Sequence, residues 1–170
     1  MDALKVFGAD YLKPATLSRL EVLEQATPNL TWLDMDLAYG IGVGRPFTLT
    51  RLKNVVASDS SFHDLDQLTR CDFPAVESMT ITVDVDELGD EDRALATMKR
   101  LFGEGFAPAL RRLSFCIFYQ NEPSRRFIDL LARSTPELLQ RRSLEKVTLP
   151  RVFDGREEEQ IEELLGDKLG

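Results

Sequence analysis

Apolar residues recur along the chain in a six-residue pattern, apolar-x-x-apolar-x-apolar. The segments with this pattern are LKVFGA from Leu4, LTWLDM from Leu30, LKNVVA from Leu52, VESMTI from Val76, LRRLSF from Leu110 and LEKVTL from Leu144. Their first residues lie 26, 22, 24, 34 and 34 positions apart. A recurrence of this length is typical of stacked repeat arrays. The pattern therefore predicts about six structural repeats.

Each segment is predicted to be a β-strand, with positions counted from its first apolar residue. The fourth and sixth positions are apolar and alternate with polar ones, as a strand with one buried face requires. The pairs predicted to be buried are Phe7/Ala9, Leu33/Met35, Val55/Ala57, Met79/Ile81, Leu113/Phe115 and Val147/Leu149. Pro28, Pro74 and Pro108 each stand two residues before a segment, where a residue without an amide proton suits the start of a strand.

Several stretches between the strands have the apolar spacing of helices. One helix is predicted in residues 16–26, and another should begin behind Asp90 and end at Gly103 or Gly105. In residues 123–142, the triplet Ser134-Thr135-Pro136 is a second helix-start signal, which predicts two helices or one broken helix. Residues 38–48 contain three glycines without a helical period and are predicted to be a loop.

Strands that begin alike and are separated by helices imply right-handed crossovers and a parallel sheet. The stretches TPNLTWLDM, FPAVESMTI and FAPALRRLSF resemble strand entries of irregular intracellular members of the leucine-rich repeat family, and the resemblance covers residues 4–152. The chain is similar to the ribonuclease-inhibitor-like and F-box-associated groups of that family. The resemblance implies an α/β fold, a leucine-rich-repeat-like solenoid with a curved parallel sheet and helices on the convex side.

Two parts of the chain are expected. Residues 1–153 would form the array of about six irregular repeats, and the acidic segment 154–170 would form a capping helix over the last repeat. A detachable acidic partner helix is the alternative for this segment. The first strand begins at Leu4, which leaves no room for an N-terminal cap and predicts an open strand edge. We expect that edge to continue into a longer protein or to be covered by another copy.

Positions three, five and seven of each strand should point to the concave face of the sheet. The predicted partner-binding residues there are Trp32, Asp34, Asp36, Asn54, Ser58, Ser78, Thr80, Thr82, Arg112, Ser114, Lys146 and Thr148. Acidic residues mark the early strands and basic residues the late ones, which suits an extended, oppositely polarised polypeptide. Trp32 is the only tryptophan and is either an aromatic binding anchor or a residue packed under the Gly40–Gly44 loop.

The overall charge argues against two classes of partner. Twenty-nine acidic and 21 basic residues give a net charge of −8, which repels nucleic acid and anionic membranes. No apolar run approaches the roughly 20 residues that span a bilayer, and the N-terminus lacks the regions of a signal peptide. The sequence predicts a soluble protein of the cytoplasm, with the nucleus not excluded.

The chain offers little catalytic chemistry. His63 is the sole histidine, and its spacing from Cys71 and Cys116 does not favour a Cys–His nucleophile pair. The two cysteines are expected to be reduced. We predict no catalytic residue.

Neither a cofactor nor a metal is predicted. The Gly40–Gly44 stretch lacks the Lys-Ser/Thr of a phosphate-binding P-loop. The pairs Asp64/Asp66 and Asp84/Asp86 lack the rest of a calcium loop, and solvated turn charges account for them.

The leading functional hypothesis is a non-enzymatic module that binds a polypeptide on the concave sheet face. The resemblance adds a role as the substrate-selecting part of a larger ligase adaptor. Two alternatives stay open: a small α/β enzyme that uses His63 with a cysteine or carboxylate, and a structural element that self-assembles through its N-terminal edge strand.

Overall fold

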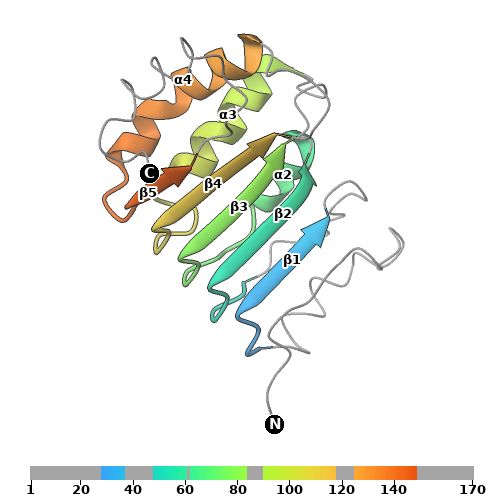
Figure 1. The fold of residues 1–170 in the computed structure, drawn as a ribbon, viewed down its shortest axis with the longest axis vertical. Helices are drawn as coiled ribbons and strands as arrows, with labels where there is room; N and C mark the ends of the chain where they lie inside the picture. The colour runs from blue at the N-terminus through green and yellow to red at the C-terminus, as the bar shows by residue number, and fades with distance from the viewer. Residues whose placement is uncertain (1–27, 37–47, 61, 84–89, 118–124, 149–170) are drawn as a thin grey trace.

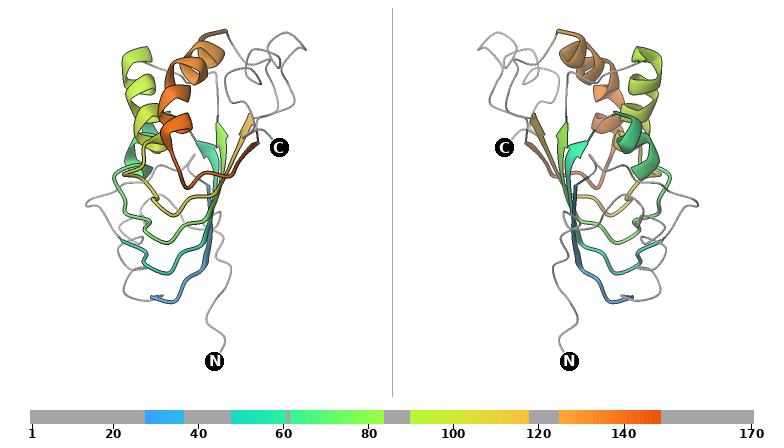
Figure 2. Two further views of the ribbon diagram at one scale, coloured as in Figure 1. Left: turned by 90° about the vertical axis from the view of Figure 1, so that its left-hand side faces the viewer. Right: turned by 90° about the vertical axis from the view of Figure 1, so that its right-hand side faces the viewer.

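The computed structural model describes residues 28–36, 48–60, 62–83, 90–117 and 125–148 of the 170-residue chain. They form a parallel sheet with helices on one of its faces (Figures 1 and 2). In chain order the elements are β1 (Trp32–Asp36), β2 (Asn54–Ser60), α2 (Phe62–Leu68), β3 (Ser78–Val83), α3 (Glu91–Phe102), β4 (Arg112–Ile117), α4 (Arg125–Gln140) and β5 (Lys146–Thr148). The predicted α/β class and parallel sheet are confirmed.

The order of the described strands in the sheet follows their order in the chain, from β1 to β5, and every neighbouring pair is parallel. Equivalent positions of the six-residue pattern lie opposite one another. The third positions, for example, are paired in the row Trp32, Asn54, Ser78, Arg112 and Lys146. Connections of different lengths thus return the chain to the same register.

The strand entries repeat the same main-chain hydrogen bonds. The carbonyl at position two accepts from two amides of the next strand entry, as when Thr31 accepts from Lys53 at 2.9 Å and from Asn54 at 3.1 Å. The carbonyls of Lys53, Glu77 and Arg111 each accept two such bonds in the same way. Because these bonds use backbone atoms, they fix the register at the entry whatever side chain stands there.

The core lies between the sheet and the helices. Positions one and four of the described strands are buried, and so are Ala57, Ile81 and Phe115 at position six. Phe102 of α3 meets Phe115 edge-on, with ring centroids 5.6 Å apart. The predicted buried pairs are confirmed where both side chains are described. Phe7, Ala9, Leu149 and the side chain of Met35 lie outside the described residues.

Helix α3 begins and ends as predicted. The Asp90 side chain accepts from the amide of Arg93 at 3.0 Å, which satisfies one of the unpaired donors of the first turn. The amide of Gly103 donates back to the carbonyl of Lys99 at 2.9 Å at the other end. The spacing of Leu95, Met98, Leu101 and Phe102 predicts one apolar face; the helix buries Met98, Leu101 and Phe102, and Leu95 is partly buried against the core.

The prediction of two helices or one broken helix for residues 123–142 is wrong. Helix α4 is continuous and contains Pro136. Ser134 does not cap a new helix. Its hydroxyl donates to the carbonyl of Leu130 at 2.7 Å, and that of Thr135 donates to Leu131 at 2.8 Å. These hydroxyls bind carbonyls of the preceding turn, so the residues that resembled a helix start lie in the interior of one helix.

Other predictions fall outside the described residues. They are the first strand and its edge at Leu4, the helix in residues 16–26, residues 38–47 of the glycine-rich loop, and the capping helix in 154–170. Within the part of the chain that is described, no helix has the length and apolar character needed to cross a bilayer.

Candidate functional site

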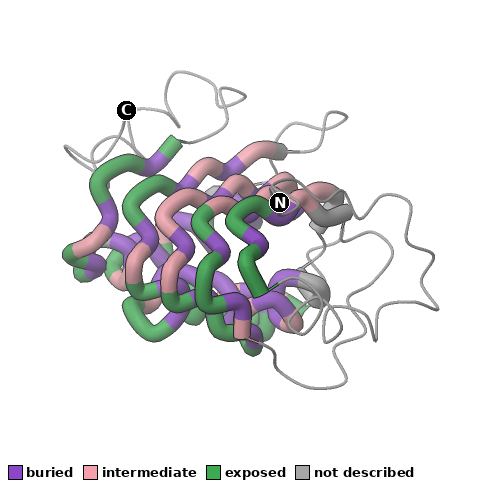
Figure 3. Tube along the Cα trace, turned by 90° about the horizontal axis from the view of Figure 1, so that it is seen from below, coloured by how far each residue is buried: buried purple, intermediate pink, exposed green. Residues whose placement is uncertain are grey.

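The sheet has one face that no described helix covers, which we call the outward face (Figure 2). Along each strand, buried residues alternate with more exposed ones (Figure 3). The more exposed positions are three, five and seven, and they form three rows across the strands. Row three contains Trp32, Asn54, Ser78, Arg112 and Lys146; row five contains Asp34, Val56, Thr80, Ser114 and Thr148; row seven contains Asp36, Ser58, Thr82 and Cys116.

The structure brings the twelve predicted partner-binding residues into one sheet. Rows three and five run without interruption through the register of the five strands. Row seven is interrupted, because the pairing of β2 with β3 shifts between Ala57 and Ser60. The side chain of Asp36 lies outside the described residues. Rows three and five therefore form a continuous surface across the five strands, which a partner could bind.

Trp32 is the exposed aromatic residue of the outward face. Its relative exposure is 43%, and among the described residues it is the only large hydrophobic residue that is exposed. It stands on β1, an edge strand of the described sheet. A large aromatic ring in water costs free energy that burial by a partner would recover. The loop under which Trp32 was alternatively expected to pack lies outside the described residues.

Two cations occupy the other end of row three. Arg112 of β4 and Lys146 of β5 are directly paired in the register, and both side chains are exposed. Neither is in an ion pair with any described residue. Asp34, at the β1 end of row five, is half-buried. The predicted separation of acidic and basic residues across the sheet is thus present in the positions of Asp34, Arg112 and Lys146.

A row of alternating charges lies beside row three, at position two of the strand entries. Lys53 is ion-paired with Glu77 on the next repeat, and Arg111 with Glu145 at 3.0 Å. The hydrogen bond and the charge of Lys53 hold the pKa of Glu77 below its usual value, and the charges of Arg111 and Arg112 act in the same direction. Our sequence interpretation assigned no role to position two, although the succession of Lys, Glu, Arg and Glu was readable there.

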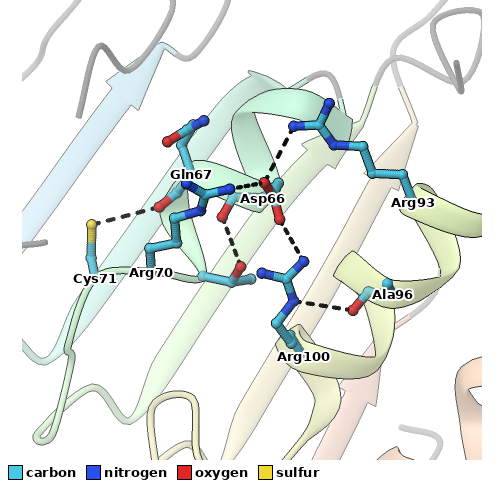
Figure 4. A network of polar contacts seen from close by, with 8 residues as sticks. Asp66, Gln67, Arg70, Cys71, Arg93, Ala96 and Arg100 are labelled. Atoms are coloured by element: carbon cyan, nitrogen blue, oxygen red, sulfur yellow. Dashed lines mark hydrogen bonds and ion pairs between the residues drawn. The ribbon is translucent and has the colours of Figure 1, made fainter. Parts of the chain in front are cut away.

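Asp66 lies behind the sheet at the contact between α2 and α3 (Figure 4). Its side chain is only 2% exposed and accepts ion pairs from Arg70 at 2.7 Å, Arg100 at 2.7 Å and Arg93 at 3.4 Å. Burial by itself raises the pKa of Asp66, but the hydrogen bond from Arg70 and the charges of Arg100 and Arg70 outweigh it, so the pKa lies below its usual value.

The expectation that Asp66 is a solvated turn charge is therefore wrong. A buried carboxylate needs partners that stabilise its charged form, and here they come from the turn after α2 and from α3. The spacing of Asp66 and Arg70, one helical turn apart, was a sequence signal for one of these pairs. The contribution of Arg100 depends on helix packing and had no local signal.

Arg141 is a second buried charged residue that the sequence interpretation missed. It precedes Leu144 by three residues, the place held by Leu49, Phe73 and Ala107 before the earlier strands. Its relative exposure is 1%. The guanidinium group donates to the carbonyls of Gly103 at 3.0 Å and Phe106 at 2.6 Å, and also to that of Ala107. These bonds tie the last strand entry to the turn after α3.

The residues considered for nucleophilic chemistry are not brought together as a described site. Cys71 is buried and its thiol donates to the carbonyl of Gln67 at 3.8 Å, while Cys116 stands in row seven of the outward face. The side chain of His63 lies outside the described residues. Within the described parts of the chain, no three histidine, cysteine or acidic side chains form a metal-binding group.

A hollow of about 550 Å³ lies at the C-terminal ends of α3 and α4. Its described lining consists of Gly103, Glu104, Glu137, Gln140 and Arg142. Glu137 is already ion-paired with Lys99 of α3 at 3.1 Å, and Glu104 accepts from the amide of Arg142 at 3.3 Å. The hollow contains none of the predicted partner-binding residues, and its acidic groups serve contacts within the chain.

Comparison of the chain with protein-family models, with curated proteins and with solved structures finds no match.

Proposed function

We propose that this protein is a non-enzymatic recognition module that binds a polypeptide partner on the outward face. In this proposal the repeats form a leucine-rich-repeat-like solenoid, and the outward face is its concave surface. The similarity of the strand entries to those of the leucine-rich repeat family supports this arrangement. The register supports it as well, because it pairs equivalent positions of five successive segments.

The observation that carries the proposal is the exposure of Trp32. A tryptophan is among the residues most often found at the energetic centres of protein interfaces. Here it is 43% exposed on a sheet face without a described helix, whereas the other large apolar side chains described are at least partly buried. Its row neighbour Asn54 is half-buried and polar, so the ring stands beside groups that can form hydrogen bonds.

The rest of the face suits an extended polypeptide. The middle strand β3 contributes Ser78, Thr80 and Thr82, whose hydroxyl groups can donate to or accept from a peptide backbone. Charged residues stand toward the two ends of the sheet, with Asp34 on β1 and with Arg112 and Lys146 on β4 and β5. They would orient a polypeptide with charges of both signs. From the family resemblance, we extend the proposal to the substrate-selecting part of a larger adaptor protein.

Affinity capture with matched baits tests the proposal. Wild-type protein, Trp32→Ala and Trp32→Phe would be immobilised and the captured polypeptides compared by mass spectrometry. We expect Trp32→Ala to lose a defined set of proteins and Trp32→Phe to keep most of it. Arg126→Ala, an exposed change on α4, is the control for a face that the proposal does not use.

Thermal unfolding of the same variants separates binding from packing. We expect Trp32→Ala to melt close to the wild-type temperature, since more than two fifths of the residue is exposed. An unchanged captured set would contradict the proposal. A large fall in melting temperature would contradict it too, because Trp32 would then be a packing residue. Size-exclusion mass across a concentration series tests the self-assembly alternative.

A further inference from the structure

We propose that Arg112 and Lys146 form a subsite for a carboxylate side chain of the polypeptide partner. This inference rests on the proposed function, because it names the chemistry of the partner that the outward face would bind. The subsite lies on β4 and β5, at the opposite end of row three from Trp32. An acidic residue of the partner would occupy it.

The two cations are held side by side by the register of the sheet. Arg112 and Lys146 are direct partners on neighbouring parallel strands, which are spaced about 4.8 Å apart. Both side chains are exposed on the same face. Like charges directly opposite one another in a sheet are destabilising. An anion bound between them would remove that repulsion and would attract both groups.

At position two, in the row beside row three, cations and carboxylates of neighbouring repeats form ion pairs. There Lys53 faces Glu77 and Arg111 faces Glu145, so every cation has a carboxylate one strand away. Row three departs from this rule at β4 and β5. At positions two and three of the strands from β2 to β5 there are four cations and two carboxylates, an excess of two positive charges. The cations are Lys53, Arg111, Arg112 and Lys146, and the carboxylates are Glu77 and Glu145. Glu77 and Glu145 form their ion pairs with Lys53 and Arg111, so among the described residues neither carboxylate is ion-paired with Arg112 or Lys146.

Local geometry favours a carboxylate on a polypeptide over a phosphate polymer. The ion pairs at position two show that a carboxylate side chain reaches a cation on the neighbouring strand. A glutamate or aspartate of the partner would fit between Arg112 and Lys146 at a similar spacing. Next to the two cations in row five stand Ser114 and Thr148, whose hydroxyls can donate to a carboxylate oxygen. The net charge of −8 repels a long phosphate backbone outside this local patch.

Binding of defined acidic probes to the full-length chain tests the subsite. Fluorescence anisotropy at low ionic strength would compare labelled hexaglutamate with labelled hexaglutamine. We expect hexaglutamate to bind more tightly, and Arg112→Gln and Lys146→Gln each to weaken it about three- to fivefold, as loss of one exposed charge pair predicts. Arg111→Gln removes the same charge one residue away, from the row that is internally paired, and should weaken binding less than about twofold.

Three results would overturn the inference. They are equal affinities for the two peptides, an equal loss of hexaglutamate affinity in Arg111→Gln, and tighter binding of a hexathymidylate than of hexaglutamate. Melting temperature is a second measurement: Lys146→Gln should melt at or above the wild-type temperature because the repulsion is removed, whereas Arg112→Gln also loses the attraction between Arg112 and Glu77 and should melt below Lys146→Gln. If the subsite fails while Trp32-dependent capture holds, the proposed function stands without it. If capture no longer depends on Trp32, the function itself fails.

Discussion

Arg141 donates from Nη2 to the main-chain carbonyl of Phe106 at 2.6 Å, across 35 residues of sequence. The guanidinium group also binds the carbonyls of Gly103 and Ala107, so one side chain satisfies several acceptors of the turn that follows α3. Burial lowers the pKa of Arg141, and the charge of Glu104 opposes that effect. A charged group is stabilised in the core here because its donors meet backbone acceptors.

Replacement of Arg141 by alanine should therefore be strongly destabilising. The carbonyls of Gly103, Phe106 and Ala107 would lose a charged donor, and a large buried side chain would leave a cavity. Hydrogen bonds to charged groups contribute about 1.5–3 kcal/mol and the cavity adds to this, so we expect a loss of at least about 3 kcal/mol in the free energy of unfolding. Urea denaturation measures the change.

Two further variants control for the position of Arg141. Arg142→Gln removes an exposed arginine from the next residue and should change the free energy of unfolding by less than about 0.5 kcal/mol. Arg141→Met keeps most of the volume but none of the donors, so it isolates the hydrogen bonds from the cavity. A methionine variant as stable as wild type would contradict the role assigned to the guanidinium group.

The ion pairs of Asp66 predict a dependence of stability on pH. The pKa of Asp66 is lowered in the folded protein, so the contribution of the carboxylate is present above the unfolded-state pKa of about 3.9 and is lost as the pH falls through the folded-state pKa. Asp66→Asn should lower the free energy of unfolding by about 2 kcal/mol at neutral pH. The difference between wild type and variant should shrink as the pH falls below about 4.

Asp72→Asn is the matched control, because Asp72 is an exposed carboxylate close in sequence and is in no ion pair with a described residue. At neutral pH the free energy of unfolding of Asp72→Asn should lie within about 0.5 kcal/mol of the wild-type value. Denaturation curves between neutral and strongly acidic pH give the comparison. A wild-type minus Asp66→Asn difference that grows on acidification would contradict the ion-pair account.

The sequence predicts the sheet well because one feature repeats. Alternation within each segment identifies the buried face, and the repetition of Leu52, Val76 and Leu110 at equivalent places predicts that the strands lie in register. The helix behind Asp90 has a capping residue, an apolar face and a terminal glycine, three local signals that agree. Such features depend on residues close in sequence or on strict repetition.

The missed features depend on contacts between distant segments. Arg141 occupies a place where earlier repeats have apolar or small residues, and nothing local shows that carbonyls of the previous turn will face it. Asp66 is buried in the folded chain, and its ion pair with Arg100 joins α2 to α3, a contact between segments distant in sequence. The rows of the outward face were predictable by position, whereas the exposure of Trp32 had to come from the structure.

The ion pair between Lys53 and Glu77 predicts a dependence of stability on salt. The pKa of Glu77 is lowered chiefly by its hydrogen bond with Lys53, and both side chains are well exposed. Glu77→Gln should lower the melting temperature at low ionic strength, and the difference from wild type should largely vanish at 1 M salt, where charges are screened beyond about 3 Å. Melting curves at the two salt concentrations test this. A difference that is independent of salt would indicate a packing role for Glu77.

Pro136 lies inside α4, and its replacement by alanine should stabilise the protein. Proline cannot donate the amide hydrogen bond that a helix interior expects, whereas alanine supplies that donor and relieves the ring clash. The gain of up to about 3 kcal/mol is reduced because the unfolded chain becomes more flexible, so we expect a net increase of about 1–2 kcal/mol in the free energy of unfolding.

Pro108→Ala is the control: it removes an exposed proline from a strand entry and should lower stability by about 0.5–1 kcal/mol. Urea denaturation of both variants measures the change in the free energy of unfolding, which should be positive for Pro136→Ala and negative for Pro108→Ala. A loss of stability in Pro136→Ala would show that the ring of Pro136 makes contacts that the helix needs.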